Sequence, residues 1–186
     1  RFDRLLSRHG NVFGPGEPPI ELWKLPLFPG IKGGSKWPSP EVAWDQMLGE
    51  IVRHWRERRW DLDRAYVYLA DEPPPGSLRT IAEYARRVRD VSGGMLRSQV
   101  ALYRVLGARW FQQTPVLGLL RDVDMIMVAG DYYNPAAMAQ LPRGTWRGMY
   151  QGGEPYQGNE TLDADGVALR SWSWIAVTRA SRSTSM

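Results

Sequence analysis

Two adjacent carboxylates, Asp71 and Glu72, stand where a run of strand-forming residues ends. The run covers residues 66–70, and three prolines follow the acids at positions 73–75. Proline donates no hydrogen bond to a β-ladder and fixes its own φ, so we expect the strand to end here. The carboxyl ends of parallel strands are where α/β folds bind ligands. This placement favours acid–base chemistry, with sugar hydrolysis as the first reaction to test; the alternative is that the acids only begin a loop and cap the next helix.

The two acids face a geometric obstacle, because consecutive residues of a strand point to opposite faces of the sheet. Asp71 and Glu72 line one pocket only if the strand end twists or bulges. The prolines that follow favour such a departure from regular geometry.

Four more polar or aromatic residues follow later predicted strands and are candidates for contacts with a substrate: Asp131, Tyr132, Tyr133 and Tyr150. The alternative for Tyr150 is an aromatic side chain that only packs within the sheet. Asp122 and Asp124 form an acid-x-acid pair, but no His lies near them and Asp124 is expected to begin a strand.

Composition excludes several kinds of site. The chain has 186 residues, enough for one domain with a sizeable core, and contains no Cys and only two His. Thiolate catalysis, disulfides and Cys-based metal sites are therefore excluded, and the two His lack a metal-ligand spacing. We expect no cofactor and no metal. Nine Trp and eight Tyr permit stacking on sugar rings without requiring it.

The net charge of +4 comes from 24 basic and 20 acidic residues, and the densest basic run lies at residues 53–59. We interpret this run as the solvated face of a helix rather than a nucleic-acid site, which would need a sustained basic surface. No apolar run approaches the roughly 20 residues of a membrane span, so none is expected.

Helix and strand patterns alternate along the chain, which indicates an α/β fold with a parallel sheet and crossover helices. The first predicted elements are a Gly/Pro-rich loop at 10–40 with a short strand near 20–25, and a helix to about 59 with Ser39 as its N-cap and Pro40 at its first position. A strand at 64–70 follows, then a helix at 77–91 capped by Ser77 and ended by Gly93 and Gly94. The remaining predicted elements are a helix at 95–106, a strand at 108–113, a short helical segment at 117–120, strands at 123–129 and 145–150, and a helix at 166–177.

Four segments in series resemble the catalytic domain of glycoside hydrolase family 123. The first is the strand that leads to Asp-Glu-Pro at residues 66–73, and the others follow in the same order and spacing at 119–128, 150–155 and 168–174. Together they cover about residues 40–175. The Asp-Glu-Pro motif alone is moderately specific, and the series is considerably more so.

The resemblance implies a TIM-type barrel and a β-N-acetylhexosaminidase, typically acting on β-linked N-acetylgalactosamine in a glycan or glycoconjugate. Such enzymes use the substrate's own 2-acetamido oxygen as nucleophile, an exception to the two-carboxylate scheme. By this resemblance Glu72 is the general acid/base and Asp71 orients the acetamido group. Tyr150 is then placed to donate a hydrogen bond to the acetamido carbonyl, and Asp131, Tyr132 and Tyr133 to contact sugar hydroxyls.

The chain departs from that family in extent. A complete barrel needs eight strands and typically about 250 residues, whereas four or five strands are recognisable here. We therefore expect an incomplete (β/α)8 barrel, its C-terminal part, over residues 1–176, with a disordered tail at 177–186. The chain begins without Met, as expected for a piece of a longer protein, and the piece can be inactive alone. An extracellular or periplasmic location is expected for the full-length protein.

Two other functions remain open from the sequence. One is an ordinary retaining glycosidase, in which Glu72 is the acid/base and Asp131 or Glu154 is the direct nucleophile; it needs no acetamido group on the substrate. The other is a non-catalytic sugar-binding remnant of such a barrel. It predicts binding without turnover, and binding that survives Glu72→Gln.

Overall fold

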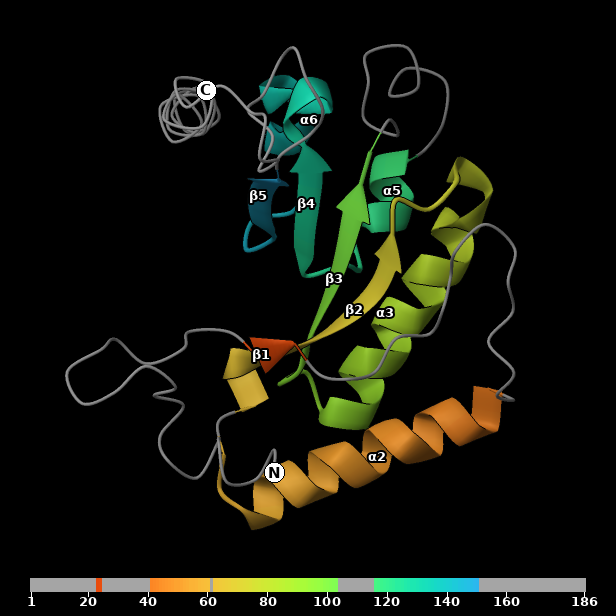
Figure 1. Ribbon diagram of the computed structural model, residues 1–186, viewed down its shortest axis with the longest axis vertical. Coiled ribbons are helices and arrows are strands. Elements are labelled where there is room, and N and C mark those ends of the chain that lie inside the picture. The colour runs from red at the N-terminus through yellow and green to blue at the C-terminus, as the bar shows by residue number, and fades with distance from the viewer. Residues whose placement is uncertain (1–22, 25–40, 61, 104–115, 151–186) are drawn as a thin grey trace, which may run out of the picture.

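The structure is a computed structural model, and it describes residues 23–24, 41–60, 62–103 and 116–150. Within these residues strands and helices alternate (Figure 1). The elements are β1 (Trp23–Lys24), α2 (Glu41–Glu57), η1 (Leu62–Arg64), β2 (Ala65–Asp71), η2 (Pro75–Ser77), α3 (Leu78–Ser92), β3 (Arg97–Leu102), α5 (Val116–Leu120), β4 (Met125–Ala129), η3 (Gly130–Tyr132), α6 (Pro135–Ala139) and β5 (Trp146–Tyr150).

The strands form one sheet whose spatial order equals their order in the chain, β1-β2-β3-β4-β5. Every neighbouring pair is parallel, and the two-residue β1 is the shortest member. Since parallel neighbours need a crossover, a helix lies in the sequence between each pair of strands. The predicted α/β class with a parallel sheet and intervening helices is therefore confirmed.

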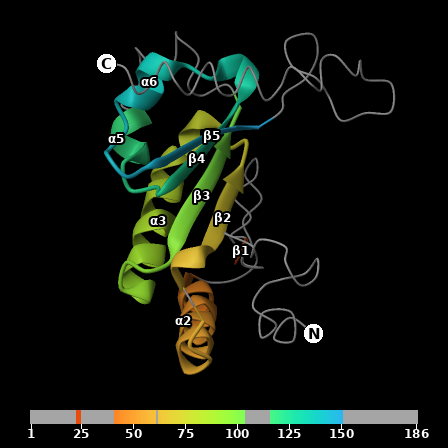
Figure 2. The same ribbon diagram turned by 90° about the vertical axis from the view of Figure 1, so that its left-hand side faces the viewer.

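The hydrophobic core lies between the sheet and its helices. Figure 2 shows α3 and α5 on the same side of the sheet. The strand residues that share this core alternate along β3, along β4 and along β2 as far as Leu69: Ala65, Val67, Leu69, Val100, Leu102, Ile126 and Val128. Ala70, next to Leu69, is also in the core and breaks the alternation. We call the opposite face of the sheet the second face; it carries the less buried strand residues Tyr66, Tyr68, Gln99 and Met127.

Helix α2 packs against α3 rather than directly on the sheet (Figure 1). Trp44 meets Tyr84 edge to face, with ring centroids 4.8 Å apart. On the outer surface of α2, Arg53 pairs with Glu50 and Glu57. The basic run thus begins on a helix surface that also carries acids. In the part of the chain that the structure describes, no helix is long and apolar enough to cross a membrane.

Of the two caps predicted for α3, the structure shows only the one at the C-terminus. Gly93 adopts the left-handed conformation, φ 67°, at the C-cap, as the predicted Gly stop requires. Ser77 occupies the N-cap position, but its side chain makes no capping hydrogen bond and its backbone is already helical. The predicted cap at Ser77 is therefore wrong: the preceding turn η2 leads directly into the helix.

The helix predicted at residues 95–106 is also wrong, because Arg97–Leu102 form strand β3. Ser98, Val100 and Leu102, at every second position, are each fully buried, as expected for a strand with one face on the core. The hydroxyl of Ser98 donates to Asp124 Oδ2 at 2.8 Å, and the backbone N–H of Ser98 donates to the same oxygen at 2.8 Å. These bonds join the start of β3 to the residue before β4 and explain how a Ser can be buried there.

Several predictions lie outside the described residues: the loop at 10–40 apart from Trp23–Lys24, the cap at Ser39 and Pro40, the strand at 108–113, the helix at 166–177 and the tail at 177–186. The short strand predicted near 20–25 corresponds to β1. The predicted strands at 64–70, 123–129 and 145–150 correspond to β2, β4 and β5. Helix α2 extends to Glu57, close to the predicted end at 59.

Candidate active site

A β-bulge in β2 decides which way Asp71 points. Tyr68 pairs with Gln99 and Ala70 pairs with Val100, so Leu69 is an extra residue without a partner in β3. Strict alternation from Tyr68 would direct Asp71 toward the helices. The extra residue restores Asp71 to the second face, opposite Ala101 in the register. The departure from regular geometry that the two acids require is therefore present.

Glu72 leaves the strand in a left-handed conformation, with φ 47°. Its backbone N–H still donates to the carbonyl of Ala101 at 2.9 Å, so the chain turns while attached to β3. A non-Gly residue in this region costs about 1 kcal/mol or more. Such strain clusters at functional sites, and here it turns the chain at Glu72 away from regular strand geometry.

Each carboxylate accepts a hydrogen bond from a tyrosine. The Tyr68 hydroxyl donates to Asp71 Oδ1 at 2.8 Å, and the Tyr150 hydroxyl donates to Glu72 Oε1 at 2.7 Å. Tyr150 also approaches the carbonyl of Leu102, at 3.4 Å. The structure thus brings Asp71, Glu72 and Tyr150 together from β2 and β5, and adds Tyr68, which the sequence did not single out.

Both phenols hold their protons strongly. Burial, the hydrogen bond to Asp71 and the charges of both carboxylates raise the pKa of Tyr68 well above its usual value of 10.0. Burial, the hydrogen bond to Glu72 and the same two charges likewise raise the pKa of Tyr150 well above that value. Since a phenolate beside a carboxylate would be repelled, Tyr68 and Tyr150 serve here as hydrogen-bond donors.

The cluster is acidic and bears no ion pair within the described residues. The arginines that pair with acids lie elsewhere: Arg89 reaches Asp122 at 3.4 Å and Asp124 at 3.7 Å, at the other end of the strands. Asp122 and Asp124 thus have ionic and hydrogen-bonding partners of their own. Among the described residues, no group of three His, Cys, Asp or Glu is placed to hold a metal ion.

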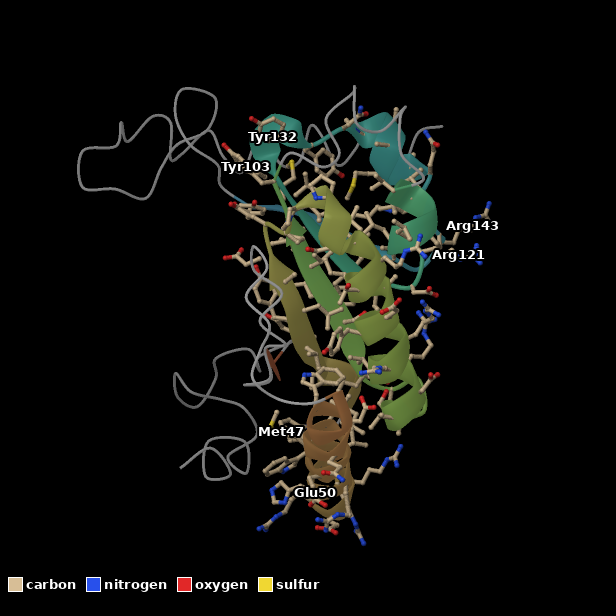
Figure 3. The ribbon with its side chains drawn as sticks, turned by 90° about the vertical axis from the view of Figure 1, so that its right-hand side faces the viewer. Met47, Glu50, Tyr103, Arg121, Tyr132 and Arg143 are labelled. Carbon is tan, nitrogen blue, oxygen red and sulfur yellow. The ribbon has the colours of Figure 1, made fainter. Side chains whose placement is uncertain are left out.

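Of the other predicted contact residues, Tyr132 and Tyr133 have different neighbours, and the side chains of Asp131 and Glu154 lie outside what the structure describes. Tyr132 packs edge to face against Tyr103, with centroids 4.9 Å apart, at the strand-end side of the sheet (Figure 3). Tyr133 is 8% exposed and belongs to the core. The backbone of Asp131 lies in η3 after β4, but its side chain is outside what the structure describes. Glu154 lies outside the described residues altogether.

Chemically, the cluster offers two acceptors and two donors at the carboxyl ends of β2 and β5. A carboxyl group such as that of Glu72, exposed and held at one oxygen, can give or take a proton. The more buried Asp71 can accept a hydrogen bond from a bound polar group or stabilise positive charge. Tyr150 is engaged by Glu72 and must leave it to donate to a substrate carbonyl.

Comparison of the sequence with models of known protein families finds no match, and comparison with curated proteins finds none either.

Proposed function

We propose that this chain carries the acid pair of a glycoside hydrolase that removes β-linked N-acetylhexosamine, with N-acetylgalactosamine as the expected sugar. The observation that carries the proposal is the strand end itself. The bulge at Leu69 and the left-handed Glu72 direct two consecutive acids into one cluster with Tyr68 and Tyr150. The resemblance of residues 66–73 to the Asp-Glu-Pro motif of glycoside hydrolase family 123 supports the same assignment.

The same proposal extends to the fold, as part of a (β/α)8 barrel. Its support is the sequential order of parallel strands, since a doubly wound sheet reverses its strand order at a switch point and a barrel does not. The acids lie at the carboxyl ends of the strands, the end at which barrel enzymes carry their active sites.

In the first step Glu72, protonated, gives its proton to the glycosidic oxygen while the carbonyl oxygen of the 2-acetamido group attacks the anomeric carbon. The bond from that carbon to the leaving oxygen breaks, and the leaving group departs as an alcohol. The product on the sugar is a bicyclic oxazolinium ion. Asp71 accepts a hydrogen bond from the acetamido N–H and stabilises the positive charge that develops there.

In the second step Glu72, now a carboxylate, removes a proton from water as the water oxygen attacks the anomeric carbon. The bond from the anomeric carbon to the acetamido oxygen breaks and the neutral acetamide is restored. Two displacements at one carbon leave its configuration unchanged, so the sugar is released with retention. Glu72 regains its proton and the cycle closes without a cofactor.

The experiment measures hydrolysis of three aryl β-glycosides, the N-acetylgalactosaminide, the N-acetylglucosaminide and the galactoside. Wild type is compared with Glu72→Gln and with Glu83→Gln, a matched control at an exposed position of α3. We expect turnover of an acetamido sugar only, lowered about 100-fold or more by Glu72→Gln and unchanged by the control.

Two outcomes would contradict the proposal. Turnover of the galactoside at a similar rate would favour a direct carboxylate nucleophile, because that sugar carries no acetamido group. No turnover by a folded wild type, together with sugar binding that survives Glu72→Gln, would favour a non-catalytic sugar-binding role.

A further inference from the structure

The two oxygens of each site carboxylate are not equivalent. Tyr68 donates to Oδ1 of Asp71, and Tyr150 donates to Oε1 of Glu72. Within the described part of the chain, neither Asp71 Oδ2 nor Glu72 Oε2 accepts a hydrogen bond. Each acid therefore has one oxygen held by a phenol and, among the described residues, one oxygen without a hydrogen bond.

The bond between Tyr68 and Asp71 depends on the bulge in β2. The two residues are three positions apart, a spacing that places side chains on opposite faces of a regular strand. The extra residue Leu69 returns Asp71 to the face of Tyr68, where the hydroxyl meets Oδ1 at 2.8 Å. The bulge thus places Asp71 on the same face as Tyr68, the residue that donates a hydrogen bond to it.

We propose that Tyr68 is a positioning residue for the reaction, holding Asp71 by Oδ1 so that Oδ2 accepts the hydrogen bond from the substrate's acetamido N–H. This inference rests on the proposed hexosaminidase function and adds a residue to it. Tyr68 touches Asp71 and acts through it. The raised pKa of Tyr68, caused mainly by burial and by Asp71, keeps the hydroxyl a donor across the working pH range.

A mainly structural role for the hydroxyl is the competing explanation, and the chain offers a matched control. Tyr66 lies two residues earlier on the same strand and the same face, and it has no hydrogen bond to a carboxylate among the described residues. Burial alone raises its pKa. Tyr66→Phe therefore removes a phenol hydroxyl from the same surface without releasing Asp71.

The test is a double-mutant cycle on the hydrolysis of an aryl β-N-acetylgalactosaminide by the full chain. The variants are Tyr68→Phe, Asp71→Ala, the double variant and the control Tyr66→Phe, each checked for folding by circular dichroism. We expect Tyr68→Phe to lower kcat about 10-fold in the wild-type background with KM changed less than about 2-fold, since a misplaced Asp71 weakens the transition state more than binding. In the Asp71→Ala background the same change should cost less than about 2-fold, because no carboxylate is left to position.

Equal losses from Tyr68→Phe in both backgrounds would overturn the inference, and so would no loss in the wild-type background. A folded wild type with no activity toward any acetamido sugar would overturn the proposed function, and this inference with it. The wild-type rates alone therefore separate a failure of the proposed function from a failure of the role inferred for Tyr68.

A second measurement does not require Tyr68→Phe to fold. Ring-labelled tyrosine NMR follows the Tyr68 phenol through an alkaline titration in wild type and in Asp71→Ala. The phenol should ionise at lower pH in the variant, because Asp71 contributes both a hydrogen bond and a charge that disfavour the phenolate. Identical titration curves, over the pH range in which circular dichroism shows both proteins folded, would overturn the inference.

Discussion

Replacing Tyr68 and Tyr150 together with Phe should make the protein less stable near neutral pH but more resistant to alkali. Near pH 8 the variant lacks two hydrogen bonds to carboxylates. Buried bonds to charged groups contribute about 1.5–3 kcal/mol each, but Glu72 is exposed and Asp71 only half-buried, so about 0.5–1 kcal/mol each is appropriate. The expected loss in unfolding free energy is therefore about 1.5 kcal/mol.

At high pH the stability difference between wild type and the double Phe variant reverses its sign, because the pKa values of both phenols are raised in the folded protein. In the unfolded chain a Tyr ionises near pH 10, so above that pH the unfolded state binds fewer protons than the folded state. The unfolding free energy of wild type then falls by up to about 1.4 kcal/mol per pH unit for each phenol. The contribution of the two phenols to the unfolding free energy is fully present below about pH 10 and is progressively lost above it. At pH 11 the two phenols together remove up to about 2.8 kcal/mol, an upper limit because both are partly exposed.

The two effects predict that the stabilities of wild type and the double Phe variant cross near pH 10.5. Urea unfolding followed by circular dichroism at pH 8, 9, 10, 10.5 and 11 measures the difference directly. Tyr66→Phe is the control near neutral pH, where it should leave the unfolding free energy little changed, because Tyr66 has no hydrogen bond to a carboxylate among the described residues. A stability difference that stays constant from pH 8 to pH 11 would refute the argument that these phenols resist ionisation in the folded protein.

Two further predictions concern β3 and the turn after β2. Ser98→Ala removes a fully buried hydroxyl that donates to Asp124 Oδ2 at 2.8 Å and accepts from the Asp124 N–H at 3.2 Å. The unfolding free energy should therefore fall by about 2–3 kcal/mol. A loss below about 1 kcal/mol in urea unfolding would contradict this role. Glu72→Gly should be more stable than Glu72→Ala by about 1 kcal/mol, the reverse of the usual order, because only Gly adopts φ 47° without strain. Thermal unfolding of the two variants decides the order, and an Ala variant as stable as the Gly variant would show that the turn is not strained.

Local signals in the sequence were sufficient for several elements. The prolines at 73–75 predicted where β2 ends, and Gly93 predicted where α3 ends. The candidate pair Asp71 and Glu72 also followed from these signals, because a strand end is a local feature. Each of these predictions depends on residues within a few positions of one another.

The features that were missed depend on contacts between distant residues. The apolar residues at 95–106 predict a helix, whereas the burial of the polar Ser98 in β3 depends on hydrogen bonds to Asp124, 26 positions later. The bulge at Leu69 is defined by the register of β2 against β3, which no single segment contains. Tyr68 was overlooked as a site residue for that reason, since regular alternation separates it from Asp71.

The bulge has a consequence for protein engineering. Transplanting residues 66–72 onto a regular strand of a designed barrel would carry every side chain of the motif, yet Asp71 would then project into the layer beneath the sheet. A graft needs a host whose neighbouring strand is one residue shorter over the same span, as β3 is here between Gln99 and Val100. A designer must therefore copy the mismatch in register between two strands and not only the sequence of residues 66–72.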